Sequence, residues 1–277
     1  MGWTVPSSSE YTAYQSVIDR VLTGAEGDLA AVIRSLASVG DIVTIREQLK
    51  LVLPALVDTY GPALTEGLIQ WYDEVRPSTV SSYKPKALSG GDLSQTIDRT
   101  AHYTAGFLSM DTGKAARVLG GAMGRMIQTG PRRTMLMAAD LDPSSPRFAR
   151  IPVGKTCAWC SMLASRGWVY SSRELAGGAG HEFHSHCDCQ IVPDWLHKGV
   201  RGYNPDDLYS RYQLARRRAI DDGYTRPDAS TIASYMRRAH PDAYTDGEGV
   251  ARSSKPLRSK ALEDLAQQSP KNGENNG

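Results

Sequence analysis

The sequence lacks any run of about 18 apolar residues, which is the length that a membrane-spanning helix needs. Its first residues carry neither the positively charged part nor the apolar part of a secretory signal, so we expect none. Pro6 also breaks the N-myristoylation pattern that Gly2 would begin. Charge is nearly balanced, with 32 Lys and Arg against 30 Asp and Glu and a net charge of +2. The overall charge of the chain therefore favours binding to neither nucleic acid nor a membrane, and any basic surface must be local.

The common catalytic motifs are missing as well. Neither a G-x-S-x-G nucleophile motif nor a phosphate-binding P-loop occurs. Ser185 stands where an H-E-x-x-H metalloprotease motif starting at His181 needs its second histidine. Zinc deaminases place H-x-E before P-C-x-x-C, whereas here C-x-x-C comes first and no proline precedes Cys157. We therefore expect no catalytic residue and a protein that is not an enzyme.

Cysteine is scarce, and all four cysteines lie between residues 157 and 189. A disulfide framework usually spreads over a small secreted chain, whereas cysteines packed beside histidines indicate metal ligands. A C-x-x-C turn presents two thiolates on one side of a loop, which suits tetrahedral zinc. The candidate ligands are Cys157, Cys160 and Cys187, then Cys189 and His184, then His186. Six candidates compete for four places, so the sequence leaves the ligand set open. Such a site can supply folding energy on the order of 10 kcal/mol.

The N-terminal half has the apolar periodicity of helices, over residues 10–36, 41–75, 93–129 and 132–139. We expect Gly24 and Gly27 to interrupt the first of these helices. Pro54 and Pro62 should kink or break the second, because each removes a helical hydrogen bond. A linker rich in Pro, Ser and Gly occupies about 77–92. The sequence therefore predicts a helical region over 1–139.

Shorter elements follow the turn-rich loop at 140–146. Strand character occurs at 147–153, 168–170 and 190–193, with a short helical stretch at 161–165. Two better-marked helices come next, one between Asn204 and Gly223 and one over 229–239 opened by Asp228. We expect a small zinc-stapled α+β module at 140–200, a helical hairpin at 201–247 and a flexible tail at 248–277. The predicted fold class is α+β, mostly α, with a helical C-terminal arm.

Arginines gather near the ends of the two C-terminal helices. They are Arg216, Arg217, Arg218, Arg237 and Arg238. Cations near a helix C-terminus interact favourably with the helix dipole, which is a sufficient structural reason for them. The sharper interpretation is a contact with nucleic acid or with a portal protein.

The cysteine-centred segment resembles the MuF-like minor head proteins of tailed phages, and most closely their actinobacterial-phage branch. The resemblance rests on C-A-W-C-S-M-L-A-S-R-G at 157–167 and on H-S-H-C-D-C at 184–189. It extends more weakly over roughly 55–195, through Y-G-P at 60–62 and W-Y-D-E-V-R at 71–76. The H-x-x-C-x-C element of that family falls on His184, Cys187 and Cys189, which the resemblance therefore implies as ligands.

The resemblance implies a minor capsid protein of head morphogenesis, present in few copies inside the virion capsid and assembled in the host cytoplasm. Its partners would be the portal protein and the major capsid or scaffolding protein, and phage DNA is a further candidate. The role would be head assembly and DNA packaging or ejection, with zinc as cofactor and no membrane. Two alternatives remain open at this point, which are a zinc-dependent phage nuclease and a DNA-binding adaptor.

Overall fold

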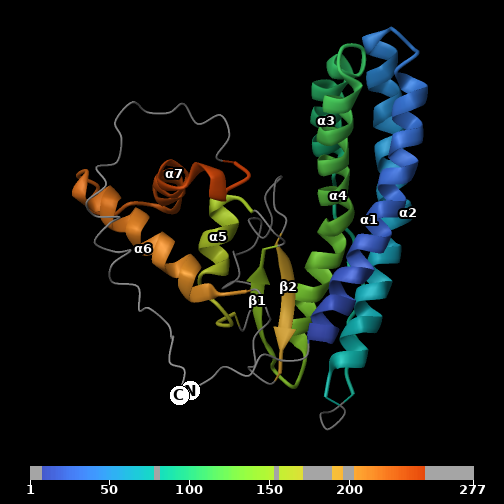
Figure 1. The fold of residues 1–277 in the computed structure, drawn as a ribbon. Coiled ribbons are helices and arrows are strands. Elements are labelled where there is room, and N and C mark those ends of the chain that lie inside the picture. The colour runs from blue at the N-terminus through green and yellow to red at the C-terminus, as the bar shows by residue number, and fades with distance from the viewer. Residues whose placement is uncertain (1–7, 78–81, 153–155, 171–188, 196–202, 247–277) are drawn as a thin grey trace, which may run out of the picture.

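The computed structural model describes residues 8–77, 82–152, 156–170, 189–195 and 203–246. Three layers follow one another in Figure 1, with a long helical bundle, a small sheet and a group of shorter helices. In chain order the elements are α1 (Ser8–Leu36), α2 (Ile42–Val75), α3 (Ser94–Leu108), α4 (Thr112–Leu141), β1 (Arg147–Ile151), α5 (Ala158–Ala164), β2 (Gln190–Asp194), α6 (Pro205–Asp221), α7 (Ala229–Ala239) and a 3-10 turn (Pro241–Ala243).

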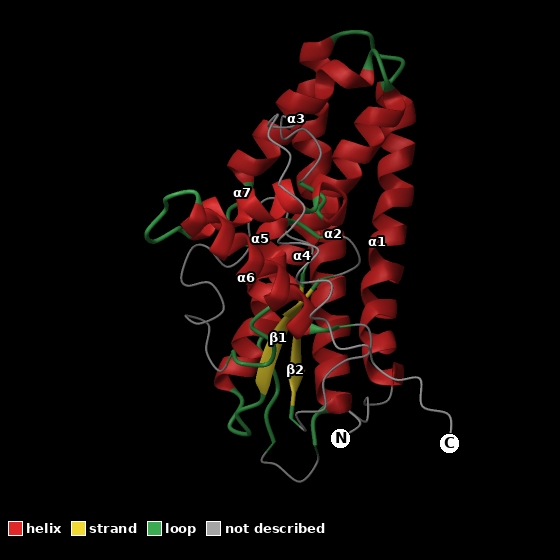
Figure 2. Cartoon of the chain, turned by 60° about the vertical axis from the view of Figure 1, so that its left-hand side comes forward, coloured by secondary structure: helices red, strands yellow, loops and turns green. Residues whose placement is uncertain are grey.

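Helices α1 to α4 form the bundle, in which α2 packs on α1, α3 and α4. Each helix buries one apolar stripe, and the bundle core continues without a break into side chains of both strands. Figure 2 shows the strands beside one end of the bundle, while the α1–α2 and α3–α4 loops lie together at the opposite end. We call that opposite end, with loops 37–41 and 109–111, the bundle end.

The helix breaks expected in α1 and α2 do not occur, while a kink at the two prolines of α2 stays a prediction. Helix α1 runs through Gly24 and Gly27 without interruption, and α2 continues through Pro54 and Pro62. At Gly24 the missing side chain lets the ring of Tyr60 approach, since a Cβ there would lie 3.2 Å from that ring. Burial of the apolar stripes on both sides of these residues outweighs the local cost of glycine and proline in a helix.

The helix boundaries predicted between residues 93 and 139 were wrong. The structure ends α3 at Leu108 and begins α4 after Asp111, whose side chain accepts a hydrogen bond from the backbone N–H of Lys114. The segment 132–139, predicted as a separate short helix, is the last part of α4, which passes through Pro131. An aspartate N-cap thus fixes the start of α4, whereas the glycines of its first half leave it intact.

Strands β1 and β2 pair antiparallel, with Phe148 opposite Pro193 and Ile151 opposite Gln190. The strand expected at 168–170 is reduced to an isolated bridge between Tyr170 and Phe148. Helix α4 contacts β2 on one side, and α5 contacts β1 on the other. The small sheet therefore joins the bundle to the three shorter helices.

Helices α6 and α7 form the expected hairpin, and their predicted ends are confirmed. Asn204 caps α6 by accepting from two backbone N–H groups, and Asp228 caps α7 by accepting from the backbone N–H of Thr231. Gly223 follows the C-cap of α6 with a φ of 103°, a conformation that favours glycine. The mostly helical α+β class is confirmed as well. In the part of the chain that the structure describes, no helix is both long and apolar enough to cross a membrane. The expected tail at 248–277 lies outside the described residues.

Two buried polar clusters tie the bundle to the sheet. In the first, the hydroxyl of Tyr14 donates to the carbonyl of Ile191 at 3.1 Å. Nearby, the amide of Gln190 donates to the side-chain oxygen of Gln128 at 2.7 Å. Helices α1 and α4 are thereby both bonded to β2. Because buried polar groups are costly unless they are paired, these bonds specify how the strand sits on the bundle.

The second cluster centres on Asp142, which follows α4. Both of its carboxylate oxygens accept from Arg76 at the end of α2, each at 2.7 Å. Tyr72 and Ser144 also donate to this carboxylate, and the indole of Trp195 donates to the Ser144 hydroxyl. The cluster therefore links the ends of α2 and α4 to the residue that follows β2.

Gly130 in α4 should not tolerate a side chain. A Cβ there would lie 2.8 Å from the carbonyl oxygen of Leu88 and 3.1 Å from the backbone nitrogen of Gly90. Because both contacts are backbone, we expect Gly130→Ala to lower the free energy of unfolding by about 1–3 kcal/mol. Gly27→Ala is the matched control, since a Cβ at exposed Gly27 meets nothing within 4 Å and should stabilise α1 by roughly 0.5–1 kcal/mol. Chemical denaturation compares the two variants, and equal effects would contradict this assignment.

Candidate metal centre

The C-x-x-C pair lies at the start of α5. Cys157 is the N-cap of this helix, and its sulfur accepts a hydrogen bond from the backbone N–H of Cys160 at 3.2 Å. Both side chains are buried. A backbone N–H donated to sulfur stabilises the thiolate, which is the form that binds metal. The local sequence therefore folds into a turn that presents two cysteines together.

Cys189 reaches the same two cysteines from a different part of the chain, immediately before β2. It is fully buried, and the Nε of Arg150 on β1 donates to its sulfur at 3.4 Å. Arg150 is itself buried to 1% exposure. A guanidinium keeps its positive charge in proteins, so its burial against this sulfur favours the thiolate of Cys189.

Cys157, Cys160 and Cys189 pack into one buried cluster, with Trp159 against it. These three described thiols form no disulfide with one another. Within the described ranges, no group of three or more His, Cys, Asp and Glu side chains is arranged to hold a metal. The other predicted ligands, His184 and Cys187, lie outside the described residues, as does the lower-ranked His186.

The donor chemistry fits a thiolate-rich zinc site. Cysteine sulfur is the usual ligand of structural zinc, and the structure brings three cysteines together with a backbone N–H and a guanidinium on their sulfurs. The remaining ligand or ligands would come from 184–188. The three cysteines are thus of a type that suits zinc, and a closed four-coordinate site at this cluster stays a prediction.

Two residues near this cluster were missed by sequence reasoning. Arg150 lies in the short strand β1, and the signal available in the sequence was a charged residue between apolar ones. Asp246 bears no local motif, yet its carboxylate accepts from the backbone N–H of Ala158, between the two cysteines of the turn, at 3.0 Å. This contact joins residues that are 88 positions apart, so no local sequence pattern could identify Asp246.

The five arginines proposed for nucleic-acid or portal contact do not share one environment. Arg237 pairs with Asp246 at 2.8 Å, and Arg218 lies 3.8 Å from Asp222. Arg238 lies over the ring of Tyr235, 4.0 Å from its centre. The other two, Arg216 and Arg217, are exposed on α6. The set is thus divided between three residues that contact side chains of their own helix or of the segment after α7 and two that face solvent.

Comparison with known proteins gives two matches. The family described as "VG15 protein" matches residues 6–215. The "Gene 15 protein" of Mycobacterium phage L5 is 31% identical over a match that covers 25% of this chain and 37% of that relative. The match therefore spans little more than a third of the relative's length. No solved structure matches this chain. Together these similarities indicate a bacteriophage protein.

Proposed function

Because the chain belongs to the VG15 family, we propose that it is a MuF-like minor capsid protein of head morphogenesis. It acts inside the virion capsid, where it associates with the portal and aids head assembly and DNA packaging or ejection. The observation that carries this proposal is the buried cluster of Cys157, Cys160 and Cys189, which are the cysteines through which the sequence resembles MuF-like proteins. The similarity to a mycobacteriophage protein is in keeping with the actinobacterial-phage branch.

We propose a structural role for zinc in this protein. Cys157, Cys160 and Cys189 would hold it together with His184 or Cys187, and its binding would supply folding energy to this segment. A hydrolytic zinc needs an open coordination position, which a full set of four protein ligands would not leave. The donor set thus favours a structural component over a nuclease.

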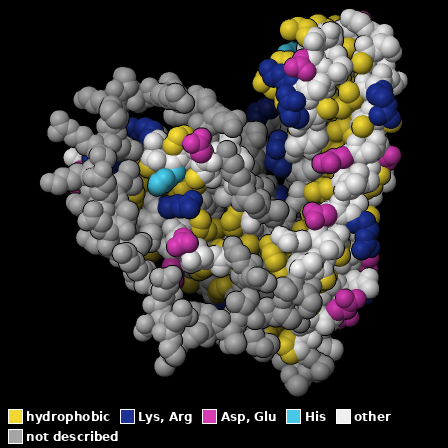
Figure 3. Space-filling model, viewed as in Figure 1, with side chains coloured by type: hydrophobic (Ala, Val, Ile, Leu, Met, Phe, Trp, Pro, Cys, Tyr) yellow, Lys and Arg dark blue, Asp and Glu magenta, His cyan; other side chains and the backbone are white. Residues whose placement is uncertain are grey.

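The bundle end is the docking surface for the portal in this proposal. Large apolar side chains are exposed there, including Met110 at 82% and Val43 at 56%. Figure 3 shows hydrophobic surface interspersed with Lys and Arg over this part of the bundle. The carboxylates of Asp41 and Asp111 at the same end accept backbone N–H bonds as helix caps. Exposed apolar side chains beside cations suit a partner surface that is apolar with an acidic rim.

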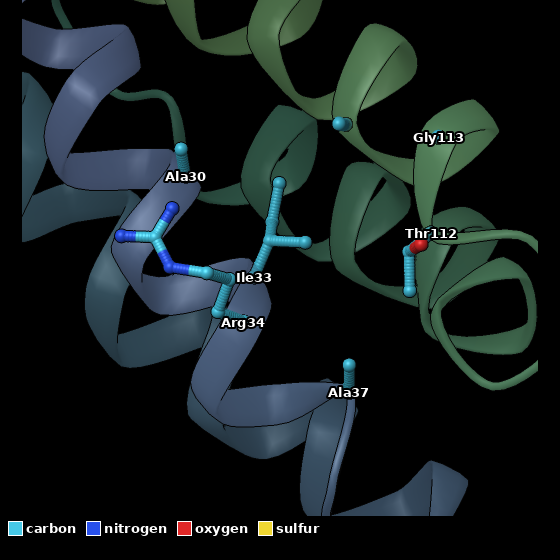
Figure 4. A pocket seen from close by; sticks show the side chains of 7 residues that line it. Ala30, Ile33, Arg34, Ala37, Thr112 and Gly113 are labelled. Carbon is cyan, nitrogen blue, oxygen red and sulfur yellow. The ribbon is translucent and has the colours of Figure 1, made fainter.

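A pocket of about 420 Å³ opens beside this surface, between the end of α1 and the start of α4. Figure 4 shows its walls, formed mostly by small side chains. The residues are Ala30, Ile33, Arg34, Ala37, Thr112, Gly113 and Ala116. Such a pocket can receive an apolar anchor from a partner, and the exposed Arg34 can meet an acidic group beside that anchor.

A double variant, Val43→Glu with Met110→Glu, tests both the location of the protein and its docking surface. A phage lacking this gene is complemented with wild type or with the double variant, and the protein in purified heads is measured by quantitative mass spectrometry. Wild type should be present in heads, and the double variant should fall at least about tenfold, because charges replace apolar contacts. Its folding stability should stay within about 0.5 kcal/mol of wild type, since both side chains are exposed.

Val169→Glu is the matched control, because Val169 is exposed to 54% but lies outside the bundle. It should enter heads as wild type does. Heads that contain no wild-type protein would contradict the proposed function. Normal entry of the double variant would instead contradict the assignment of the bundle end as the docking surface.

A further inference from the structure

The segment before the tail runs beside the cysteine turn. Thr156, which precedes Cys157, forms a parallel bridge with Tyr244, and the backbone N–H of Thr245 donates to the carbonyl of Thr156 at 3.0 Å. Tyr244 itself is buried among side chains of α5, α6 and α7. The segment that follows the α6–α7 hairpin is therefore hydrogen-bonded to Thr156, the residue that leads into the C-x-x-C turn.

Asp246 completes this attachment with both of its oxygens. Oδ1 accepts from the backbone N–H of Ala158 at 3.0 Å, and Oδ2 accepts from the Nε of Arg237, in the last turn of α7, at 2.8 Å. Ala158 is the first residue of α5, so its N–H has no partner within that helix. One carboxylate thus holds the cysteine turn on one side and the C-terminal hairpin on the other.

The charge of the Asp246 carboxylate is paired within the protein. Arg237 offsets that charge, and the pair is partly shielded, with side chains 24% and 31% exposed. Since both oxygens of Asp246 already accept hydrogen bonds, we assign it a role in orienting the turn and not in binding the metal directly.

We propose that Asp246 is a positioning residue for the metal centre, which couples zinc affinity to the docking of the α6–α7 hairpin. This inference rests on the zinc site of the proposed function. By accepting the Ala158 N–H, Asp246 fixes the backbone between Cys157 and Cys160, and so it fixes the direction in which the two sulfurs point. Outer contacts of this kind orient metal ligands, and losing one weakens metal binding about 10- to 100-fold.

The experiment measures zinc affinity of the full chain by competition with a chromophoric chelator, with circular dichroism to verify folding. Asp246→Ala should weaken zinc binding at least about tenfold. Asp246→Asn keeps an oxygen that can accept the Ala158 N–H, so it should recover much of the loss. Arg237→Gln leaves the acceptor in place and should have a smaller effect than Asp246→Ala. Exposed Asp242→Asn is the matched control and should bind zinc as wild type does.

Three outcomes separate the claims. Weaker zinc binding in Asp246→Ala, with recovery in Asp246→Asn, supports the positioning role. Unchanged zinc affinity in Asp246→Ala, with a melting temperature lowered equally with and without zinc, overturns it and leaves the zinc site standing. A wild-type protein that binds no zinc overturns the metal site and this inference together.

Discussion

Replacing Asp142 by Asn should destabilise the protein by about 3–5 kcal/mol, because it leaves the guanidinium of Arg76 buried without its counter-charge. The side chains of Arg76 and Asp142 are only 6% and 0% exposed, so water cannot replace the lost partner. The amide also turns one acceptor toward Arg76 into a donor, which places two donors against each other. Ion pairs on the protein surface contribute far less to stability, so charge changes at exposed positions should have smaller effects than Asp142→Asn.

Chemical denaturation at neutral pH provides the measurement for Asp142→Asn. Asp73→Asn is the matched control, because it makes the same chemical change on the exposed side of α2. The control should change the free energy of unfolding by no more than about 0.5 kcal/mol. An Asp142→Asn protein as stable as the control would show that the Arg76 pair contributes nothing net.

The Asp142 carboxyl also determines the direction in which folding stability changes with pH. Burial alone would raise the pKa of Asp142, but hydrogen bonds donated by Arg76, Ser144 and Tyr72 outweigh it and hold that pKa well below its ordinary value of 3.8. The stabilisation is therefore complete above the ordinary pKa and is lost as pH falls below it. The difference in stability between wild type and Asp142→Asn should be constant from pH 7 to about 5 and should shrink toward pH 2.

Removing zinc is the second change with a large expected effect. If the cysteine cluster holds the metal, its binding contributes on the order of 10 kcal/mol to folding of that segment. A strong chelator, or Cys160→Ser, should therefore unfold the α5 region while α1 to α4 retain their helical signal. Elemental analysis of untreated protein should give one zinc per chain, and X-ray absorption should give four-fold coordination dominated by sulfur.

His181→Ala is the control for the metal experiment, since His181 is outside the ligand set and should leave stability mostly intact. Zinc with a bound water and mainly nitrogen ligands, together with DNA cutting that His181→Ala abolishes, would favour the nuclease alternative. A protein that contains no metal, and that a chelator leaves unchanged, would contradict the zinc site.

Local signals predicted the parts of the fold that depend on few residues. Asn204, Asp228 and Gly223 were identified from sequence because a cap or a left-handed turn is set within one helical turn. Pro54 does not end α2, because its local cost is outweighed by apolar side chains of α2 that become buried only when the other helices pack against it. Helix breaks in a bundle therefore require knowledge of partners far along the chain.

The residues of the candidate site also differ in whether a local sequence pattern could reveal them. Cys157, Cys160 and Cys189 were all named as candidates from the sequence, and the structure packs them into one cluster. Arg150 and Asp246 could not be found in this manner, because each reaches the cluster through contacts of the folded chain. Whether His184 and Cys187 complete the ligand set stays a prediction.

The bond between Tyr14 and Ile191 has a consequence for synthesis of the protein. The two residues are 177 positions apart, and Tyr14 is fully buried once they meet. At typical rates of translation, roughly 9–35 s pass between the appearance of one and of the other. During this interval the ring of Tyr14 waits without its strand, so the nascent first helix needs either neighbouring helices or a chaperone to cover it. The sheet should accordingly close on the bundle only after all four bundle helices have been made.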